Sequence, residues 1–568
     1  MRYSKFFICL ALLATTLGAC NKKLDGLLDS PNLPSPTTAD VDLSLNQVQL
    51  AFRGFWGNAS TIGAELSRQQ SWFGPIYANG YSPETFNGLW STAYSSIFVN
   101  ADQMIPVAQS QKKFIQSGIA KVLKAYTLGT LVDQFGDIPY TEAIQGVANT
   151  NPKIDKGADV YAKALALLDD AIVDFNKTGA ADRPANDLFY GTQSTNAATA
   201  ALWKKAAKSM KLKFLMNTRL VDASVSAKIA ALITENDLVT TDAQDFNFKY
   251  GSNNSSPDSR HPKYAGNYNV NGQVGEYLST YFMDLVVKEK TGTVSTLDPR
   301  RRYYFYRQNT NYANVNETTL TCAFVSNPAH YPANMPFCLV GGNSGYWGRD
   351  HGDNSGTPPD GAYRTTYGIY PAGGEFDAST GGAVKLLMGG RGAGVDPIWN
   401  SSFTYFVEAE AALKLGITAG GTARALLSKA LYASINKVVG FPASIGYSLS
   451  NAQLALVPTT AQIDTYVNFV LAQYDAATTD DARLNIIMKE YYIAAWGNGV
   501  ETYNSYRRTG KPDNIQLVVT TASPGVFMRS FTYPSVYMNR NLNAPTQKNP
   551  GVAANKVFWD NNPDNFIK

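Results

Sequence analysis

The chain has 568 residues, more than one small hydrophobic core can use, so its length predicts two subdomains or an extended array of repeats. Its net charge is +4 and charged residues make up only 17% of the sequence, which argues against nucleic-acid binding and against strong attraction to anionic lipid. Asn, Thr, Ser, Gly and Tyr take the place of the missing charges. Such a surface suits an uncharged polar ligand such as a sugar, although it also suits exported proteins that bind no ligand.

The N-terminus has the pattern of an export signal. Arg2 and Lys5 precede an apolar run, and the segment Leu17-Gly18-Ala19-Cys20 closes it. This ending resembles the lipobox of bacterial lipoproteins, so we expect residues 1–19 to be a signal peptide and Cys20 to carry lipid. The alternative is an ordinary secretory signal with an incidental cysteine. The apolar run is too short to span a bilayer, whereas acyl chains on Cys20 would hold the protein on the membrane.

A short tether and a helical part are predicted to follow. Residues 20–40 combine three prolines with serines and threonines, a composition that buries no core and favours an extended chain. Residues 41–244 have a mainly helical pattern, with the clearest helices expected at residues 119–135, 160–175 and 200–220. The first of these is apolar on two sides, which is typical of a helix enclosed by others. Asp159 is the expected N-cap of the second helix.

Residues 245–400 have a different composition. Gly, Asn, Tyr, Pro and Ser dominate this part, helical periodicity fades, and short strands are expected, for instance at residues 383–388. Long ordered loops are usually functional rather than filler. We therefore predict that residues 245–400 form the loop-rich, ligand-binding part of the protein.

Helical periodicity returns in residues 401–568. Helices are predicted at residues 403–415, 423–438, 463–474 and 480–495, and Gly416 is the expected stop of the first. Paired helices with small residues at their contacts resemble tetratricopeptide hairpins, although the spacing is too irregular to define an array. The predicted fold class is mainly α: a tetratricopeptide-like scaffold of helical hairpins with long irregular loops and a few short strands.

Two cysteines remain in the mature body once Cys9 leaves with the signal peptide and Cys20 is lipidated. They are Cys322 and Cys338. Exported proteins fold in an oxidising compartment, which favours a disulfide between them. A loop of about 15 residues closed in this way is worth about 3 kcal/mol in the loop-entropy description. Two separate buried thiols are the alternative.

Motifs for catalysis and metal binding are scarce. The sequence has three histidines and lacks the Gly-x-Ser-x-Gly pattern of a nucleophile elbow. One loop contains a set of residues, most of them with side-chain oxygens, which are the ligands that calcium prefers. Their spacing does not match the known calcium loop, and such residues also form ordinary turns. The set comprises Asp350, His351, Asp353, Asn354 and Asp360. We predict no catalytic residue, no metal and no cofactor.

Aromatic side chains give the stronger binding signal. They crowd into two segments, residues 72–94 and residues 346–370. Flat rings can stack on the apolar faces of sugars while their edges tolerate water. The alternative is that these rings pack the core. The residues predicted to stack on a ligand are Trp72, Tyr81, Trp90, Tyr346 and Trp347.

Three stretches resemble one known family. They are Asp133–Ala143 (DQFGDIPYTEA), Gly345–Asp353 (GYWGRDHGD) and Trp496–Glu501 (WGNGVE), the last followed by Tyr506–Gly510 (YRRTG). Together with the lipobox they resemble the SusD/RagB nutrient-binding outer-membrane lipoproteins of Bacteroidetes-type bacteria. The resemblance covers nearly the whole mature chain. It implies a body of four tetratricopeptide-like hairpins, loops that carry the ligand surface, and a SusC-like TonB-dependent barrel as partner, with this protein as a lid on the outer mouth of the barrel.

The sequence therefore predicts a non-catalytic lipoprotein, anchored to the outer membrane and exposed on the cell surface. We expect it to bind nutrient polymers, most simply glycans or oligosaccharides, and to deliver them to the barrel, with no role for nucleic acid. One alternative is a binder of peptides or another polymer that uses the same lid mechanism. Others are a lipid-anchored glycoside hydrolase, for which no motif is present, and a purely structural surface protein.

Overall fold

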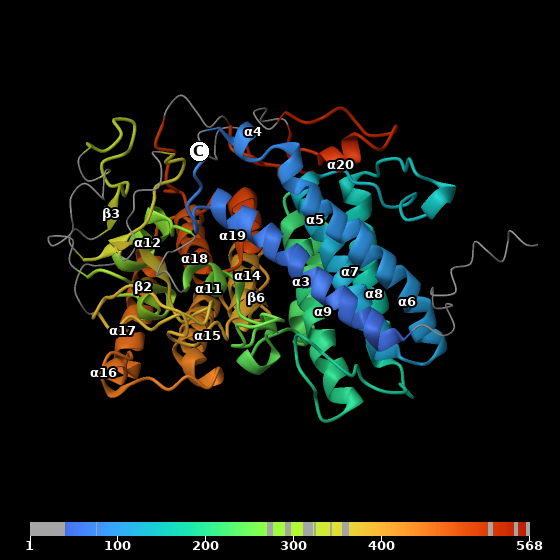
Figure 1. The fold of residues 1–568 in the computed structure, drawn as a ribbon, viewed down its shortest axis with the longest axis horizontal. Helices are drawn as coiled ribbons and strands as arrows, with labels where there is room; N and C mark the ends of the chain where they lie inside the picture. The colour runs from blue at the N-terminus through green and yellow to red at the C-terminus, as the bar shows by residue number, and fades with distance from the viewer. Residues whose placement is uncertain are drawn as a thin grey trace, which may run out of the picture.

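The computed structural model has two groups of helices and a loop-rich part that lies between them in the sequence (Figure 1). Helices α3 and α5–α9 form one side of the molecule in this view, and α14–α18 lie on the other. In space, much of the loop-rich part lies on the same side as the second group. The structure describes residues 40–74, 76–269, 276–289, 297–310, 322, 325–340, 344–354, 363–520, 526–549 and 555–563. The predicted signal peptide and Cys20 lie outside these residues.

The first group of helices begins directly after the predicted tether. Asp40 caps α3 by accepting hydrogen bonds from the backbone N–H groups of Asp42 and Leu43. Almost every residue of α7 is buried, which confirms a helix enclosed by others. The elements are α3 (Val41–Leu66), α4 (Tyr77–Gly80), η1 (Pro83–Phe86), α5 (Asn87–Ser91), the π-helical η2 (Thr92–Phe98), α6 (Val99–Ser110), α7 (Phe114–Phe135), η3 (Gly146–Ala148), α8 (Gly157–Asn176), α9 (Asn196–Thr218), α10 (Val225–Glu235) and η4 (Asp242–Gln244).

The middle part contains short helices and three two-stranded antiparallel ladders, which pair β1 with β6, β2 with β5 and β3 with β4. The expected strand at residues 383–388 is wrong, because this segment forms turns in which Leu387 has a positive φ of 70°. The elements are β1 (Phe246–Lys249), α11 (Pro262–Asn267), α12 (Thr280–Val287), α13 (Arg301–Tyr304), β2 (Phe305–Arg307), β3 (Leu339–Val340), β4 (Tyr346–Trp347), β5 (Thr365–Tyr367) and β6 (Val395–Trp399).

The second group of helices packs as hairpins, with α14 against α15 and α17 against α18. Gly416 ends α14 in the left-handed conformation, as the sequence predicts. The mainly α class is confirmed, and the paired helices are consistent with a tetratricopeptide-like scaffold. The elements are α14 (Ser401–Leu415), α15 (Ala423–Ser444), α16 (Asn451–Leu454), α17 (Thr460–Ala476), α18 (Asp480–Ala494), α19 (Gly499–Thr509) and α20 (Ser535–Met538).

The N-terminus of α8 is capped from a distant segment. Asp159, the expected N-cap, lies inside the first turn, because the helix begins at Gly157. The carboxylate of Asp137 accepts the hydrogen bond of the Gly157 N–H group at 2.8 Å. Asp137 itself follows Gly136, which ends α7 with a φ of 73°. The Gly136-Asp137 pair therefore stops one helix and starts the next.

Helix α3 crosses the start of α19 at very short range. A Cβ atom added to Gly63 would lie 2.2 Å from the carbonyl oxygen of Gly499, and one added to Gly499 would lie 1.9 Å from that of Ser60. Only glycine allows this approach. The Ser60 hydroxyl accepts the Gly499 N–H at 2.9 Å and donates to the Gly497 carbonyl at 3.2 Å. This crossing fixes the position of α3 relative to the start of α19.

A buried ion pair network links the two groups of helices. The Glu410 carboxylate on α14 accepts hydrogen bonds from Arg508 of α19 at 2.7 and 3.0 Å and from Arg219 at 2.9 Å. Burial opposes ionisation of Glu410, but the two guanidinium groups outweigh it and lower its pKa to about 2. Arg508 belongs to the YRRTG stretch, so that stretch has a structural role.

Candidate functional site

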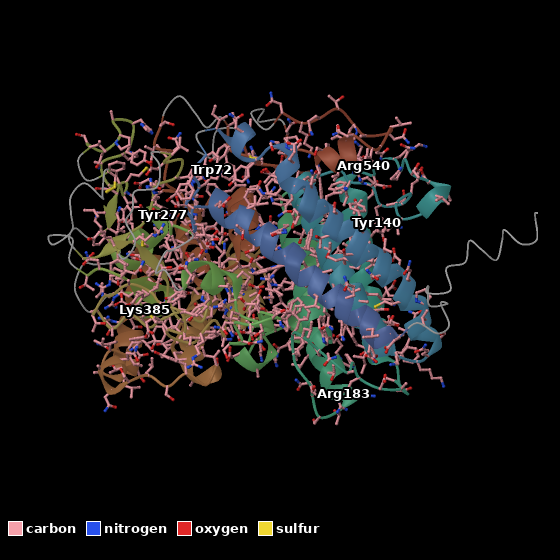
Figure 2. The ribbon with its side chains drawn as sticks, in the orientation of Figure 1. Trp72, Tyr140, Arg183, Tyr277, Lys385 and Arg540 are labelled. Carbon is pink, nitrogen blue, oxygen red and sulfur yellow. A yellow bond between two sulfur atoms is a disulfide. The ribbon has the colours of Figure 1, made fainter. Side chains whose placement is uncertain are left out.

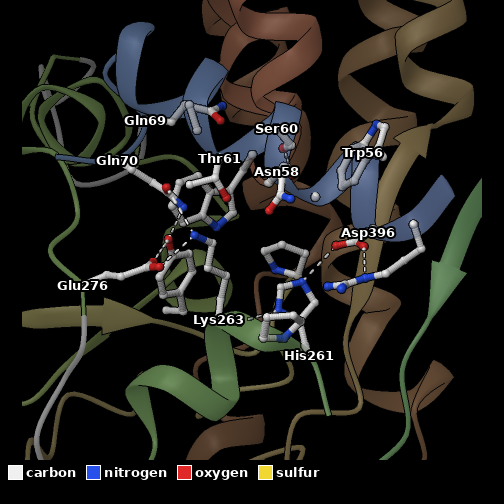
Figure 3. A pocket seen from close by; sticks show the side chains of 18 of the residues that line it. Trp56, Asn58, Ser60, Thr61, Gln69, Gln70, His261, Lys263, Glu276 and Asp396 are labelled. Atoms are coloured by element: carbon white, nitrogen blue, oxygen red, sulfur yellow. Dashed lines mark hydrogen bonds and ion pairs between the residues drawn. The ribbon is translucent and has the colours of Figure 1, made fainter. Parts of the chain in front are cut away.

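A cavity of about 270 Å³ lies between α3 and the middle part of the molecule (Figure 3). Its volume is close to the lower end of small-molecule sites, about 300–1,000 Å³, so it has room for one small ring rather than for a long polymer. Its walls come from segments far apart in sequence. The side chains used below are Arg53, Asn58, Thr61, Gln69, Gln70, His261, Lys263, Glu276, Tyr367, Asp396 and Trp496.

Helix α3 supplies one wall of this cavity, which we call the α3 pocket. Arg53, Gly57, Thr61 and Ala64 recur at the spacing of an α-helix, so they share the face that meets the cavity. Asn58 is exposed and Thr61 is half-buried. Figure 3 shows both side chains pointing toward the opposite wall. Neither makes a side-chain hydrogen bond to another residue in the described part of the chain, so both are available to a ligand.

An ion pair closes one end of the pocket. The Arg53 Nε donates to an Asp396 carboxylate oxygen at 3.3 Å, and the Tyr250 hydroxyl donates to the same oxygen at 2.6 Å. His261 Nε2 lies 3.3 Å from the other oxygen. Burial opposes ionisation of Asp396, but the hydrogen bond from His261 and the charge of Arg53 hold its pKa below the usual value. Asp396 is therefore a carboxylate at neutral pH.

The geometry around His261 makes it a poor general base. Its Nδ1 accepts a hydrogen bond from the backbone N–H of Lys263 at 3.1 Å, so the ring proton lies on Nε2, facing Asp396. Burial lowers the pKa of His261, which keeps the ring neutral. Both ring nitrogens are thus engaged within the protein. This His–Asp pair leaves no nitrogen with which to take a proton from a substrate.

A second ion pair and two stacked rings form the other end. The Lys263 Nζ donates to Glu276 at 2.9 Å, and Glu276 also accepts from the Tyr367 hydroxyl at 3.1 Å. Gln70 donates to that same hydroxyl. The rings of Tyr367 and Trp496 are stacked with centroids 5.3 Å apart. An aromatic floor beside paired charges, amides and hydroxyls is the mixture that recognises a polyhydroxylated ring.

Two buried polar atoms of the lining have no hydrogen-bond partner among the described residues. They are the Gln69 side-chain oxygen and the Trp496 indole N–H. The Gln69 amide nitrogen is used, since it donates to the Tyr492 and Ala495 carbonyls at 3.1 Å. A buried polar atom without a partner costs free energy, and a ligand in the α3 pocket that reached these two atoms would satisfy them. Other buried polar atoms among the described residues also lack partners, so these two are consistent with a binding role but do not by themselves mark the site.

The five aromatic residues predicted to stack on a ligand are all buried, with exposed fractions between 2% and 6%. Trp72 (labelled in Figure 2) and Tyr81 are stacked on each other at 5.5 Å. Trp90 packs between Phe135 and Tyr537 at 5.3 and 5.0 Å. These rings use their faces within the core, which counts against the predicted stacking surface, and contact with a ligand stays a prediction for them.

Tyr346 and Trp347 lie on β4, away from the other three residues. Trp347 packs edge-on against Tyr277 at 5.7 Å in a small cluster that includes Cys338. Tyr346 lies under the Arg307 guanidinium at 4.7 Å and lines a second hollow. The five residues therefore do not form one surface. None of them lines the α3 pocket.

The cysteine pair and the acidic loop have structural partners. Cys322 and Cys338 are joined by a disulfide with their Cα atoms 5.7 Å apart, in agreement with the predicted pairing. In the acidic loop, whose sequence favours ordinary turns over a calcium site, Asp350 accepts from the Cys338 N–H at 2.9 Å and Asp353 pairs with Arg349 at 2.9 Å. Asp360 lies outside the described residues. In the part of the chain that the structure describes, no three His, Cys, Asp or Glu residues gather to hold a metal ion.

Two family models match different parts of the chain. One, described as "Starch-binding associating with outer membrane", matches residues 46–328. The other, described as "Susd and RagB outer membrane lipoprotein", matches residues 396–559. The chain belongs to the SusD/RagB family. It is accordingly an outer-membrane nutrient-binding protein.

Solved structures share the fold over nearly the whole chain. A SusD/RagB family protein from Bacteroides thetaiotaomicron is 21% identical with a TM-score of 0.63, and the match covers 92% of this chain and 100% of the other. A protein described as chitin-binding is 20% identical with a TM-score of 0.60, at 92% and 100% coverage. A chitin-binding SusD homologue from Flavobacterium johnsoniae is 16% identical with a TM-score of 0.56, at 92% and 99% coverage. No curated protein matches the chain.

Among the described residues, no helix is both long enough and apolar enough to cross a bilayer.

Proposed function

We propose that this protein captures glycans at the cell surface and passes them to a SusC-like TonB-dependent barrel in the outer membrane. The family membership supports the delivery role, and the chitin-binding relatives with the same fold support a glycan as cargo. The α3 pocket is the proposed place where one sugar unit of the glycan is held. The observation that carries this assignment is the pair of free polar side chains, Asn58 and Thr61, above a floor of stacked rings.

The charges of the α3 pocket favour a neutral sugar. Arg53 is balanced by Asp396 and Lys263 by Glu276, and His261 is neutral. An acidic ligand would meet two carboxylates at close range, and a basic ligand would meet two cations. A neutral polyol exchanges hydrogen bonds with all of these groups without disturbing the pairs. A peptide is the second candidate cargo, since its backbone is also neutral and polar.

The membrane anchor is part of the proposal. Cys20 would carry the lipid, and residues 20–40 would hold the folded body away from the membrane surface. We expect Cys20→Ala to release the protein from the outer membrane into a soluble form. Cell fractionation in a strain that lacks the barrel checks this, because the barrel could retain an unlipidated protein. Continued membrane association of the variant in that strain would rule out the anchor.

We further propose that the protein is not an enzyme. The family consists of binding proteins, and the one histidine–carboxylate pair of the α3 pocket has no free ring nitrogen. Incubation with mixed polysaccharides followed by chromatography of the products tests this point. Release of shorter oligosaccharides by pure protein would favour a glycoside hydrolase instead.

The test of ligand binding is an array of neutral glycans, acidic glycans and peptides probed with the purified protein. We expect neutral glycans to bind, and the best of them to be titrated by calorimetry against Thr61→Phe. The added ring fills the α3 pocket without removing a charge, so affinity should fall at least about 30-fold, which corresponds to about 2 kcal/mol. Leu50→Phe, on an exposed part of the same helix, is the matched control. Equal binding by wild type and Thr61→Phe would move the site elsewhere.

A further inference from the structure

A second hollow surrounds the short helix α13. One pocket of about 350 Å³ and another of about 180 Å³ lie on either side of this helix. Both are lined by Leu297, Arg301 and Arg302, so they form one continuous depression, which we call the α13 groove. The first pocket adds Val287, Lys288, Arg307, Ser344, Tyr346 and Ser379, and the second adds Pro299, Ala455, Leu456, Val457, Pro458 and Gln462.

Among the described residues, the lining of the α13 groove carries four cations and no carboxylate. The cations are Lys288, Arg301, Arg302 and Arg307. Just behind the lining, Asp377 accepts two hydrogen bonds from Arg307, at 2.6 and 3.1 Å. Asp284 lies 3.9 Å from Lys288. Asp377 and Asp284 thus stand beside Arg307 and Lys288, and among the described residues the excess of positive charge comes from Arg301 and Arg302.

Arg301 and Arg302 are the source of this excess. Within the described residues, neither has a carboxylate within ion-pair distance. Arg301 makes a single long hydrogen bond, to the Asp298 carbonyl at 3.5 Å. Arg302 is held by neutral oxygens, the Asp377 carbonyl at 2.8 Å and the Ser379 hydroxyl at 2.7 Å. Burial and the neighbouring Arg301 lower the pKa of Arg302, and the charge of Asp377 opposes this shift only in part.

The groove is preorganised for an oxyanion. Arg307 is fixed by Asp377, by the Ser344 carbonyl at 2.8 Å and by the Ser379 hydroxyl at 2.7 Å, which it shares with Arg302. Its guanidinium lies 4.7 Å above the ring of Tyr346, another member of the lining. Guanidinium forks held in place lose little entropy on binding and match the two oxygens of a carboxylate or sulfate. The apolar side chains around Leu297 offer a surface for the carbon skeleton that bears the anion.

We propose that the α13 groove binds the carboxylate or sulfate group of an acidic glycan. This assignment rests on the proposed role in glycan capture, but it uses a site separate from the α3 pocket. The groove supplies the cations, and the ligand supplies the missing negative charge. The α3 pocket, with its balanced charges, would hold a neutral unit. The protein would then recognise glycans that contain both neutral and acidic sugars.

The test uses calorimetric titration of the purified protein with hexagalacturonate and with its fully methyl-esterified form, which keeps the sugar chain and removes the charges. We expect the acid to bind at least about tenfold more tightly than the ester, as charge-assisted hydrogen bonds require. Raising the salt concentration from 50 to 500 mM should weaken binding of the acid and leave the ester unchanged. A sulfated dextran oligosaccharide, titrated in parallel, shows which of the two anions the groove prefers.

Variants locate the site. Arg301→Gln and Arg302→Gln should each reduce affinity for the acid at least about tenfold, whereas Arg540→Gln, an exposed arginine beside α20 (Figure 2), should have no effect. Arg301→Gln removes only one long hydrogen bond, so the protein should fold normally, and thermal unfolding verifies this. Equal affinity for acid and ester, failure of both anions to bind, or unchanged binding by the Arg301 and Arg302 variants would overturn the proposal.

The same titrations separate this proposal from the proposed function. If neutral glycans bind to wild type and to Arg301→Gln but not to Thr61→Phe, this supports the α3 pocket as a glycan site whether or not the α13 groove binds an acidic sugar. Binding to vesicles that contain phosphatidylglycerol, with no binding of the acidic glycans, would show that the groove meets lipid phosphate and would overturn the glycan assignment.

Discussion

The α3 pocket and the α13 groove treat charge in opposite ways. In the α3 pocket each cation has its carboxylate, Arg53 with Asp396 and Lys263 with Glu276. In the α13 groove four cations meet two carboxylates, and Arg301 has no acidic partner among the described residues. Elsewhere in the fold some buried cations have carboxylate partners, as Arg508 has in Glu410, and other cations such as Lys548 are held by carbonyl oxygens. The α13 groove differs because its cations line a hollow that a ligand can enter.

The largest expected change in the free energy of unfolding comes from the helical scaffold. It shows what a buried cation costs when its carboxylate partner is removed. Glu410→Gln would leave Arg508 and Arg219 buried without their carboxylate, so we expect the free energy of unfolding to fall by about 3–5 kcal/mol. Urea denaturation at pH 7 measures it. Glu408→Gln on the same helix is the matched control. Burial raises the pKa of Glu408 to about 7, so its neutral replacement should be harmless or stabilising. Equal losses in both variants would contradict this account.

The paired end of the α3 pocket comes next. Asp396→Asn leaves Arg53, whose side chain is 25% exposed, without its partner, and should cost about 2–3 kcal/mol. The pKa values of Asp396 and His261 are both lowered in the folded protein, so the contribution of each group to the free energy of unfolding falls as the pH falls. The contribution of His261 falls below its unfolded pKa near 6.5, and that of Asp396 below about 4. Asp396 raises the pKa of His261 against the effect of burial, so its loss should depress that pKa further, and denaturation between pH 7 and 4 should show a steeper decline in the variant. An unchanged slope would rule out this pairing.

Glu65, beside the α3 pocket, should change the pH dependence of stability in the opposite direction. Glu65 accepts from the Tyr81 hydroxyl at 2.8 Å, and burial raises its pKa to about 7. A carboxyl with a raised pKa binds its proton more tightly in the folded state, so stability falls as the pH rises from about 4.5 to 7. We expect Glu65→Gln to be about 2 kcal/mol more stable than wild type at pH 8, and no more stable at pH 4. Parallel curves at all pH values would exclude this effect.

The α13 groove gives the smallest expected change in stability. Arg301→Gln should alter the free energy of unfolding by less than about 0.5 kcal/mol, because the side chain has no ion pair to lose within the described residues. Its loss should appear only in the binding of acidic glycans. Measured by the same urea method, a destabilisation as large as that of Glu410→Gln would mean that Arg301 is structural, and the contrast between the two hollows would disappear.

The sequence predicted the scaffold well because helical periodicity is a local signal. The predicted helices at 160–175 and 403–415 correspond to α8 and α14 within a few residues. Prediction from local patterns failed where the partner of a residue lies in a distant segment of the chain. Asp159 does not cap α8, because Asp137 does so from another loop. Lys208 of α9 is buried and pairs with Asp237 at 2.7 Å, a contact that no local pattern predicts.

The candidate sites were harder to predict. Arg53, Lys263, Asp396 and Trp496 meet only in the folded chain, and no local pattern links them. Trp496 is part of the WGNGVE stretch, but the sequence does not indicate that its side chain lines a cavity. Crowded aromatic residues pointed to Trp72 and its neighbours, which stack on one another in the core, so contact of these rings with a ligand stays a prediction. Of the five, Tyr346 lines a hollow, and it does so beside arginines that the sequence did not single out.

The central claim is that the α3 pocket holds one neutral sugar unit. A crystal structure of the protein with the best neutral oligosaccharide from the array tests it most directly. We predict a sugar ring between Asn58 and Thr61 on one side and Lys263 on the other, close to the rings of Tyr367 and Trp496. A ligand bound elsewhere on the protein, with the α3 pocket empty, would contradict the account.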